Sequence, residues 1–310
     1  MKVLNVAVCI PTFNRKELLV KCLDAVSSQT LTPKCIYIID NHSSDGTPEF
    51  LKEKGYDQSV NGVEVDYFYS EINGGGALGF SLAMEKAYKK GIYDAFWMLD
   101  DDGLPAHDCL EKLSRYVGQY GYVSPVLMDI NDKDLLNVPC NGSRNPEVLK
   151  KMYGGHDVMK GYCNPFNGGL FSKKAVARVG FPKRELFIYG DEMNYNQRMV
   201  EAGFIPYGIF QARHMHPVVR VDNLKRFARC VTFRDVEWSF YCACRNSVYN
   251  KKIRKDFVGK KILKIVYYIL AHYVFFLFIH PSFKYICLFT NAVHDGLCER
   301  WGKQYKYLKK

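Results

Sequence analysis

Apolar and amphipathic segments alternate along about the first hundred residues, and this alternation limits the chain to few folds. Short apolar runs predict strands near residues 5–10, 35–40, 64–69 and 95–100. Between the first two runs, apolar side chains recur at helical spacing: Leu18, Leu19, Cys22, Leu23 and Val26. Strands that alternate with helices predict an α/β fold with a mostly parallel central sheet flanked by helices.

The composition is typical of a globular protein. The chain has 310 residues, of which 48% are hydrophobic and 24% charged, enough for one main domain and a tail. Met1 and Lys2 lead straight into the first predicted strand, so we expect no cleavable signal and a cytoplasmic protein. The 11 cysteines lack paired spacing and therefore favour reduced thiols over disulfides.

Three consecutive carboxylates follow the fourth predicted strand, between Trp97 and Gly103. Because side chains alternate along extended backbone, Asp100 and Asp102 can share one face. Carboxylates are preferred ligands of Mg²⁺ and Mn²⁺, which keep positions open for water and substrate phosphates. An EF-hand is excluded because Cys109 stands where its last glutamate is required. The run predicts a divalent-cation site, with a solvated acidic turn as the alternative.

Two polar loops lie where open α/β sheets bind ligands, at strand ends. One runs from Asp40 to Thr47, and the other from Asn73 to Phe80, where glycines let the backbone approach a ligand. Gly74, Gly76 and Gly79 also fit the GxGxxG pattern of dinucleotide-binding oxidoreductases. That pattern normally follows a first strand, so an oxidoreductase is the alternative here.

The second half of the chain offers an acidic pair and two histidines. Asp191 and Glu192 open a predicted helix, where a carboxylate can serve as a general base or only complement the helix dipole. His214 and His216 stand at alternate positions and face the same way if the segment is extended.

The middle of the chain, about residues 104–180, is rich in Gly, Asn and Pro and predicts irregular loops suited to acceptor contacts. Asn167-Gly168-Gly169 is the main candidate, and a tight turn before a helix near Lys173 is the alternative.

The formal charge of +11 lies largely in the last third of the chain, which predicts an anionic partner. Ile262 to Ile279 is apolar and aromatic, but shorter than the roughly 20 residues of a spanning helix. With its basic flanks, it predicts a helix in the headgroup region of an anionic leaflet. The alternatives are a helix packed on the catalytic domain or on another subunit. We expect no nucleic-acid binding, because no such motif is present and the aromatic residues are not interleaved with arginine.

In their order along residues 3 to about 250, these segments resemble family 2 glycosyltransferases of the GT-A fold. Ile10 to Arg15 resembles the first nucleotide-binding loop of that family, Ile39 to Thr47 the second, and the triple aspartate its metal motif. Asn73 to Phe80, Leu99 to Gly103 and Gly190 to Glu192 are similar to the galactofuranosyl- and rhamnosyltransferase branch.

The resemblance implies that Asp100 and Asp102 hold Mn²⁺ or Mg²⁺ against the donor diphosphate, with His214 as a further ligand and His216 as the alternative. It places the base at the second position of the acidic pair, Glu192. Because the branch normally has aspartate there, Asp191 remains open. The donor-binding residues implied are Pro11, Thr12, Asn14, Arg15, Asp40, Asn41, Asn73, Gly74, Gly75, Gly79, Asp100 and Asp101. The acceptor-binding candidates are Asn167, Gly168, Gly169, Arg198 and Arg245.

The function implied is metal-dependent transfer of galactofuranose from UDP, or of rhamnose from dTDP as the second choice. The acceptor would be a growing cell-surface glycan on a lipid carrier, as in O-antigen, capsule or cell-wall synthesis. Without a second carboxylate placed as nucleophile, we expect a single displacement with inversion. Residues 1–245 would be catalytic, divided at about residue 103 into nucleotide and acceptor halves, and 246–310 would form a helical tail at the inner membrane face. An inactive membrane-associated scaffold is a further alternative, and the tail could also join subunits.

Overall fold

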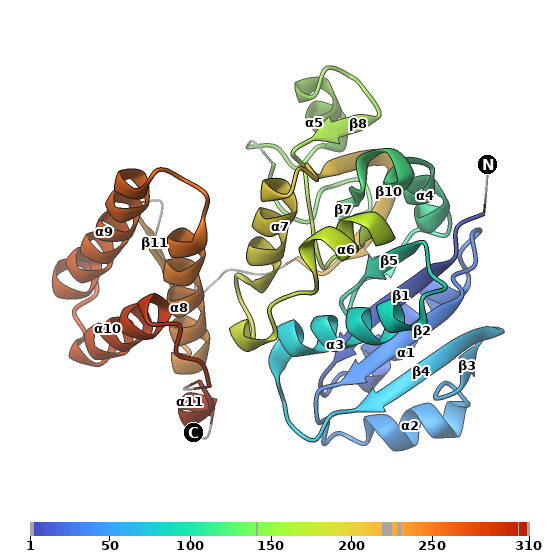
Figure 1. Cartoon of the computed structure of the whole chain (residues 1–310), viewed down its shortest axis with the longest axis horizontal. Helices are drawn as coiled ribbons and strands as arrows, with labels where there is room; N and C mark the ends of the chain where they lie inside the picture. The colour runs from blue at the N-terminus through green and yellow to red at the C-terminus, as the bar shows by residue number, and fades with distance from the viewer. Residues whose placement is uncertain (1–2, 141, 219–224, 229–230, 303, 309–310) are drawn as a thin grey trace. The chain divides into compact units, whose positions relative to one another are not determined.

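A computed structural model describes residues 3–140, 142–218, 225–228, 231–302 and 304–308 (Figure 1). It contains two compact units. The first comprises Met1–Arg184 and Tyr195–Val219, and the second comprises Glu185–Asn194 and Arg220–Lys310. This division follows compactness, whereas the boundary expected at residue 245 concerns catalysis and stays a prediction. Of the basic tail, Lys303, Lys309 and Lys310 lie outside the described residues.

A mixed sheet forms the centre of the first unit. Its strands are β1 Val6–Thr12, β2 Cys35–Asp40, β3 Ser59–Val60, β4 Val63–Tyr69, β5 Ala95–Met98, β6 Leu104–Pro105, β7 Tyr122–Asp129, β8 Val158–Lys160, β9 Gly169–Ser172 and β10 Tyr207–His216. Their order is β3-β4-β2-β1-β5-β9-β7-β10-β6, with β8 beside β10. The neighbours β4, β2, β1 and β5 are parallel, which confirms the four strands expected near the N-terminus. β9 runs antiparallel to both β5 and β7.

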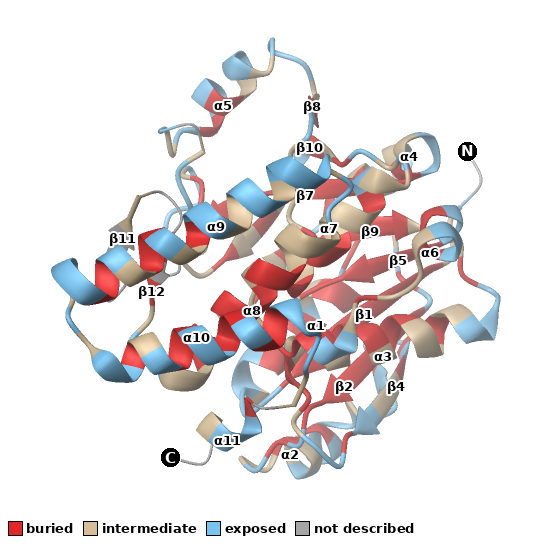
Figure 2. Ribbon diagram, turned by 60° about the vertical axis from the view of Figure 1, so that its left-hand side comes forward, coloured by how far each residue is buried: buried red, intermediate tan, exposed pale blue. Residues whose placement is uncertain are grey.

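Helices cover both faces of this sheet because successive strand residues point to opposite sides. Val6, Val8 and Ile10 belong to one core with α1 Lys16–Ser27 and α4 Cys109–Tyr120. Ala7 and Cys9 belong to the other, which also contains side chains of α3 Gly75–Lys90, α6 Lys173–Val179 and α7 Asp191–Glu201. The remaining helices of this unit are α2 Thr47–Lys54, α5 Pro146–Met152 and the start of the 3₁₀ turn Arg184–Leu186. Figure 2 shows the buried strands between partly exposed helices.

The second unit is mainly helical. It contains α8 Glu237–Ile253, α9 Val258–Val274, the π-helical turn η2 Phe275–Ile279, α10 Phe283–Leu297, α11 Tyr305–Leu308 and the hairpin β11 Lys225–Phe227 with β12 Val231–Phe233. Phe240, Phe275, Phe276 and Phe289 lie in its core. The helix expected over 262–279 is present and longer, because α9 and η2 form 22 continuous residues, within which an 18-residue stretch has a mean hydropathy of 2.1. Among the described residues it is the one helix whose length and hydropathy would allow a membrane crossing.

Candidate active site

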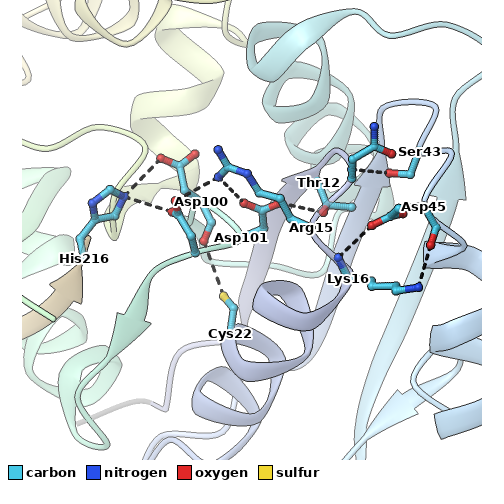
Figure 3. Close-up of polar contacts among 11 residues, drawn as sticks. Thr12, Arg15, Lys16, Cys22, Ser43, Asp45, Asp100, Asp101 and His216 are labelled. Carbon is cyan, nitrogen blue, oxygen red and sulfur yellow. Dashed lines mark hydrogen bonds and ion pairs between the residues drawn. The ribbon is translucent and has the colours of Figure 1, made fainter. Parts of the chain in front are cut away.

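Three parallel strands end at the same edge of the sheet and bring their following loops together. β1 ends at Thr12, which is in register with Asp40 at the end of β2. β5 ends at Met98, in register with Cys9 of β1, just before the three aspartates. The polar loops predicted from separate parts of the sequence are therefore neighbours in the first unit (Figure 3).

Asp100, Asp102 and His216 form a group whose ligand atoms lie within 4.8 Å of one another. His216 Nε2 is 4.0 Å from Asp100 Oδ2 (Figure 3). It is 3.2 Å from Asp102 Oδ1. β10 brings the histidine here because it pairs with β6, the short strand that directly follows the aspartate run. The structure thus places the alternative ligand, His216, beside the two carboxylates.

The atoms of this group suit a divalent cation. Asp102 Oδ1 and His216 Nε2 are buried 3.2 Å apart, and neither has a hydrogen-bond partner among the residues that the structure describes. The other ring nitrogen of His216, Nδ1, lies 2.9 Å from the carbonyl oxygen of Pro217, to which it donates. In a neutral ring, this bond leaves the Nε2 lone pair directed at the carboxylates. Two carboxylates and an imidazole form a ligand set that Mn²⁺ or Mg²⁺ accepts.

The three aspartates perturb one another electrostatically. Burial and the charge of Asp102 raise the pKa of Asp100. Burial also raises the pKa of Asp101 to about 6, although Arg15 and Thr12 oppose this. Burial acts in the same direction on Asp102, but His216 and Arg15 outweigh it and lower its pKa. A bound cation would offset the repulsion that raises the pKa of Asp100.

Asp101 faces away from the metal-ligand group and ties the acidic run to the end of β1. Thr12 Oγ1 donates to Asp101 Oδ2 at 2.7 Å. Arg15 Nη1 donates to Asp101 Oδ1 at 3.1 Å and to Asp102 Oδ2 at 3.0 Å. These residues were expected to contact the donor, and their additional contacts with the acidic run were missed. The sequence did hold one signal for these contacts, because side-chain alternation turns Asp101 to the opposite side from Asp100 and Asp102.

The second loop is held by its own side chains. Asp40 is fully buried, and its carboxylate accepts bonds from Ser43 N and Tyr67 Oη, both at 2.7 Å. Asn14 has a φ of 53°, and its Oδ1 accepts a bond from Ser44 N at 2.7 Å. The donor contacts expected of Asp40 and Asn14 therefore remain predictions, while their structural role in this loop is clear.

The glycine loop allows α3 to approach β1 and β2 closely. A Cβ added at Gly79 would lie 2.4 Å from Pro11 Cβ and 2.9 Å from Asn41 Nδ2. At Gly74 it would collide with Leu78. Before the helix, Asn73 Oδ1 accepts a bond from Gly75 N at 2.9 Å, and Gly75 has a φ of 69°. Close packing thus requires glycine at Gly79, whether or not a ligand contacts this loop.

Two of the acceptor candidates lie beside the aspartate run. Gly168 N donates to Met98 O at 2.8 Å, and Gly168 O accepts a bond from Trp97 Nε1 at 2.9 Å. Gly169 pairs with Met98 in the antiparallel ladder of β9 and β5. The neighbouring Asn167 Oδ1 is buried and has no hydrogen-bond partner in the described part of the chain, so this loop retains an acceptor group close to the site.

The other two acceptor candidates have structural hydrogen bonds. Arg198 donates to the carbonyl oxygens of Val179 and Phe181, at 3.0 and 2.7 Å. Arg245 is fully buried in the second unit, where it donates to Leu186 O at 2.8 Å and Gln304 Oε1 at 2.7 Å. Neither arrangement tests acceptor binding, but each accounts for the arginine without it.

His214, the ligand preferred from the resemblance, lies two residues further inside β10. Its side chain is fully buried, and neither ring nitrogen has a hydrogen-bond partner among the described residues. The ring packs against Gly103, where an added Cβ would lie 2.3 Å from His214 Nε2. It is not part of the group formed by Asp100, Asp102 and His216.

The acidic pair opens α7, as expected, and belongs to the second unit. Asp191 is buried, and Glu192 Oε2 accepts a bond from Gly190 N at 3.2 Å. Asn246 Nδ2 donates to Leu186, Ile188 and Tyr189 carbonyls at 2.8–3.0 Å, and Asn250 Nδ2 donates to Gly190 O at 2.8 Å. These two residues of α8 hold the loop before the acidic pair. Sequence reasoning missed this role, for which the only signal was polar residues spaced by one helical turn.

The sequence matches known proteins along most of this region. A family model described as glycosyl transferase family 2 matches residues 7–180. Galactofuranosyltransferase GlfT1 of Mycobacterium tuberculosis is 31% identical over 226 residues, which cover 69% of this chain and 70% of the relative.

Solved structures are similar over nearly the whole chain. S. aureus TarS 1-349 in complex with UDP-GlcNAc has a TM-score of 0.60 at 13% identity, and the match covers 94% of this chain and 80% of the TarS chain. The mannosyltransferase PcManGT from Pyrobaculum calidifontis in complex with GDP-Man and Mn²⁺ has a TM-score of 0.57 at 16% identity, with coverage of 99% and 79%. The chain spans 50% of a longer TarS structure. At these identities the likeness concerns the fold alone.

Proposed function

The chain belongs to glycosyl transferase family 2 and is a glycosyltransferase with the GT-A fold, and from this premise we propose that it transfers galactofuranose from UDP-galactofuranose. The likeness to GlfT1 supports this sugar, and rhamnose from dTDP-rhamnose is the second choice. A dinucleotide-binding oxidoreductase is not retained, because the GxGxxG segment follows β4 and lies inside the family match.

The group of Asp100, Asp102 and His216 is the observation on which the proposed mechanism rests. Its two orphaned buried atoms, Asp102 Oδ1 and His216 Nε2, support a cation site better than they support a self-contained hydrogen-bond network. Mn²⁺ or Mg²⁺ bound there would neutralise charge on the donor diphosphate as a Lewis acid. His214 remains the alternative ligand, and its absence from the group of ligand atoms argues for His216.

The chain's own residues would prepare this site before the donor binds. Thr12 and Arg15 hold Asp101 and Asp102 in place, so that ligand orientation is set in advance. The loops after β1, β2 and β4 would bind the nucleotide, with Asp40, Asn41 and the glycine loop at its edge. Asn167 to Gly169 would meet the acceptor sugar on the other side of β5.

The acceptor hydroxyl needs a base, for which we propose Glu192, with Asp191 as the alternative. Glu192 is partly exposed and accepts a bond from Gly190 N, whereas Asp191 is buried, which favours Glu192 as the group that reaches a substrate. Attack of the hydroxyl oxygen on the anomeric carbon would break its bond to the diphosphate and invert its configuration. Glu192→Gln and Asp191→Asn, compared by single-turnover rate, assign the base.

The proposed acceptor is a glycan on a lipid carrier at the cytoplasmic face of the membrane. A basic, apolar helical unit in the same chain supports an acceptor that is anchored in lipid. This part of the proposal fits cell-surface glycan synthesis, in which the carrier diphosphate is itself anionic.

The test is release of UDP from UDP-galactofuranose by the full chain with a membrane lipid extract as acceptor, in parallel with dTDP-rhamnose and a GDP-sugar. We expect release from one donor only, dependent on Mn²⁺ or Mg²⁺. Asp102→Ala should abolish release, whereas Glu53→Ala, which removes an exposed carboxylate from α2, should not. The anomeric configuration of the product, read by NMR, tests inversion.

Each outcome has a distinct meaning. Release from dTDP-rhamnose alone would move the donor to the second choice and keep the mechanism. Metal-independent release that survives Asp102→Ala would contradict the proposed site. No release and no binding of any nucleotide sugar would favour the inactive scaffold.

A further inference from the structure

The helix formed by α9 and η2 has two apolar faces, and only one of them is covered within the second unit. Tyr268, His272 and Phe276 are buried in the core shared with α8 and α10. The other face exposes 41–75% of each side chain of Leu263, Val266, Leu270, Val274, Leu277 and Phe278. From residue 262 to residue 279, every exposed side chain is aliphatic or aromatic.

This exposed face is continuous. Its residues recur every three or four positions from Leu263 to Leu277, the spacing of one helical stripe. Figure 2 shows the exposed side of α9. Phe257 and Phe283, which flank this helix in the sequence, are 83% and 81% exposed. A helix on the surface of a soluble protein presents polar residues there, and contiguous apolar patches of this kind mark interaction sites.

A dense basic group adjoins the N-terminal end of the stripe. Its cations are Arg254, Lys255, Lys260, Lys261 and Lys264. Three of them pair with one carboxylate, Asp256: Lys264 at 2.6 Å, Arg254 at 3.3 Å and Lys260 at 3.8 Å. Lysines in the first turn of α9 oppose the helix dipole, so their placement does not serve helix stability. Residues 254–264 carry a net formal charge of +4, from five cations and one carboxylate, and this charge complements an anionic surface.

We propose that the exposed face of α9 and η2 docks on an anionic lipid bilayer, with the helix lying in the headgroup layer. A protein partner would need acidic groups around an apolar groove, whereas a bilayer supplies both chemistries along the whole stripe. The helix does not cross the bilayer, because crossing would remove His272 and Phe276 from the core that they complete. This inference deepens the proposed function by naming the surface that brings the enzyme to a lipid-linked acceptor.

The experiment is sedimentation of the full chain with vesicles in the absence of any nucleotide sugar. One set of vesicles is phosphatidylcholine, and the other is equal parts phosphatidylcholine and phosphatidylglycerol. Wild type should bind the anionic vesicles at least about tenfold more strongly than the neutral ones. Leu270→Gln with Phe278→Gln should weaken binding to the anionic vesicles by at least about tenfold. Ile92→Gln, an exposed apolar residue of the first unit, is the matched control and should bind like wild type.

A second pair separates charge from apolar burial. Lys260→Gln with Lys261→Gln should lose most of the preference for anionic vesicles, by about tenfold or more. Lys21→Gln with Lys52→Gln removes the same charge from exposed positions of the first unit and should retain the preference. All variants should keep the wild-type circular dichroism spectrum, because every altered side chain is solvent-exposed or partly exposed.

Three results would overturn the proposal. Equal binding by the Leu270 and Phe278 double variant would exclude this face. Retention of the wild type on the membrane through an alkaline carbonate wash would indicate a spanning helix. A lipid-free dimer that Leu270→Gln dissociates, with no vesicle binding, would assign the face to a second copy of the chain. Because Asp102→Ala should bind vesicles like wild type, failure of docking and failure of sugar transfer are distinguishable.

Discussion

Asp101 is a buried carboxylate beside two others, and two opposing effects determine its ionisation. Burial raises its pKa to about 6, while Arg15 and the Thr12 hydroxyl stabilise the charged form. Only 4% of the residue is exposed, so water cannot replace a lost partner efficiently. The bond from Thr12 therefore contributes more than an ordinary surface hydrogen bond.

Thr12→Val removes that bond while keeping the shape of the side chain. We expect the free energy of unfolding at neutral pH to fall by about 1–3 kcal/mol, the range for a buried hydrogen bond to a charged group. Thr30→Val is the matched control, because Thr30 Oγ1 bonds Glu111 Oε2 at 2.8 Å in an exposed position. Urea unfolding measures both, and an equal loss in the two variants would contradict a special role for the Thr12 bond.

The two candidate ligands, His216 and His214, can be distinguished by the effect of their substitution on metal affinity. Removal of a ligand should weaken Mn²⁺ binding by at least about tenfold, so His216→Ala should show this loss in titration calorimetry. His214→Asn changes a residue outside the group of Asp100, Asp102 and His216, so it should leave the Mn²⁺ affinity within about threefold of wild type. The reverse order of effects, in variants with wild-type circular dichroism, would restore His214 as the ligand.

The carboxylates of the site were predictable from local sequence, but the choice of histidine was not. Asp100 and Asp102 follow a strand, and because side chains alternate along extended backbone they share one face. Three consecutive residues of the sequence are enough to predict this. His214 and His216 also alternate and lie on the same face of β10, so only the register of β10 against β6 decides which one meets the aspartates. That register depends on segments about a hundred residues apart in the chain. The roles of Arg198 and Arg245 were obscured for the same reason, because their partners are distant carbonyl oxygens.

At the scale of elements, α3 shows how a helix start can be adapted to a sheet. Gly76 and Gly79 lie in the same helix, yet an added Cβ would meet no atom of the described residues within 4 Å at Gly76, whereas at Gly79 it would collide with Pro11. Substitution at Gly76 therefore measures the intrinsic cost of glycine in a helix, and substitution at Gly79 measures that cost together with the close packing that requires glycine.

Gly76→Ala should raise the free energy of unfolding by up to about 1 kcal/mol, the difference in helix propensity. Gly79→Ala gains the same propensity but must push α3 away from β1, so we expect a net loss of about 1–3 kcal/mol. Thermal unfolding of both variants checks the opposite signs. A stabilised Gly79→Ala protein would mean that the loop before α3 shifts at little cost.

His272 makes the second unit sensitive to acid. Its ring is fully buried, stacks on Phe289 at 4.4 Å, and its Nδ1 lies 2.8 Å from Tyr268 O. Burial lowers its pKa to about 4. The unfolded chain therefore takes up the proton first as pH falls below about 6.5, so stability is lost down to about pH 4 and is unaffected above about 6.5.

His272→Phe should abolish this acid sensitivity. Between about pH 7 and pH 5, wild type should lose about 2 kcal/mol of stability through this group, and the variant should lose that much less. His156→Gln replaces an exposed histidine of the first unit and should retain the wild-type dependence. Urea midpoints at the two pH values provide the measurement, and parallel losses in wild type and His272→Phe would contradict the assignment.

The elements themselves were largely predictable, and their neighbours were not. Local periodicity located four strands near the N-terminus and the helices at Lys16–Ser27 and Asp191–Glu201. It carried no information that β9 would enter between β5 and β7, because strand order depends on packing between distant segments. Periodicity in the apolar tail likewise predicted a helix but not which of its two faces would be covered.

At the scale of the whole molecule, donor chemistry and membrane docking are assigned to different units. The metal-ligand group lies in the first unit, and the exposed stripe lies in the second. Loss of docking should therefore reduce the encounter with a lipid-linked acceptor without changing affinity for the nucleotide.

With acceptor in anionic vesicles, Leu270→Gln and Phe278→Gln together should lower turnover by at least about tenfold, in proportion to lost membrane binding. The Kd of this double variant for UDP, measured by calorimetry, should stay within about twofold of wild type. Weaker UDP binding would indicate damage beyond the docking face, and full turnover on vesicles would show that the enzyme reaches its acceptor without this helix.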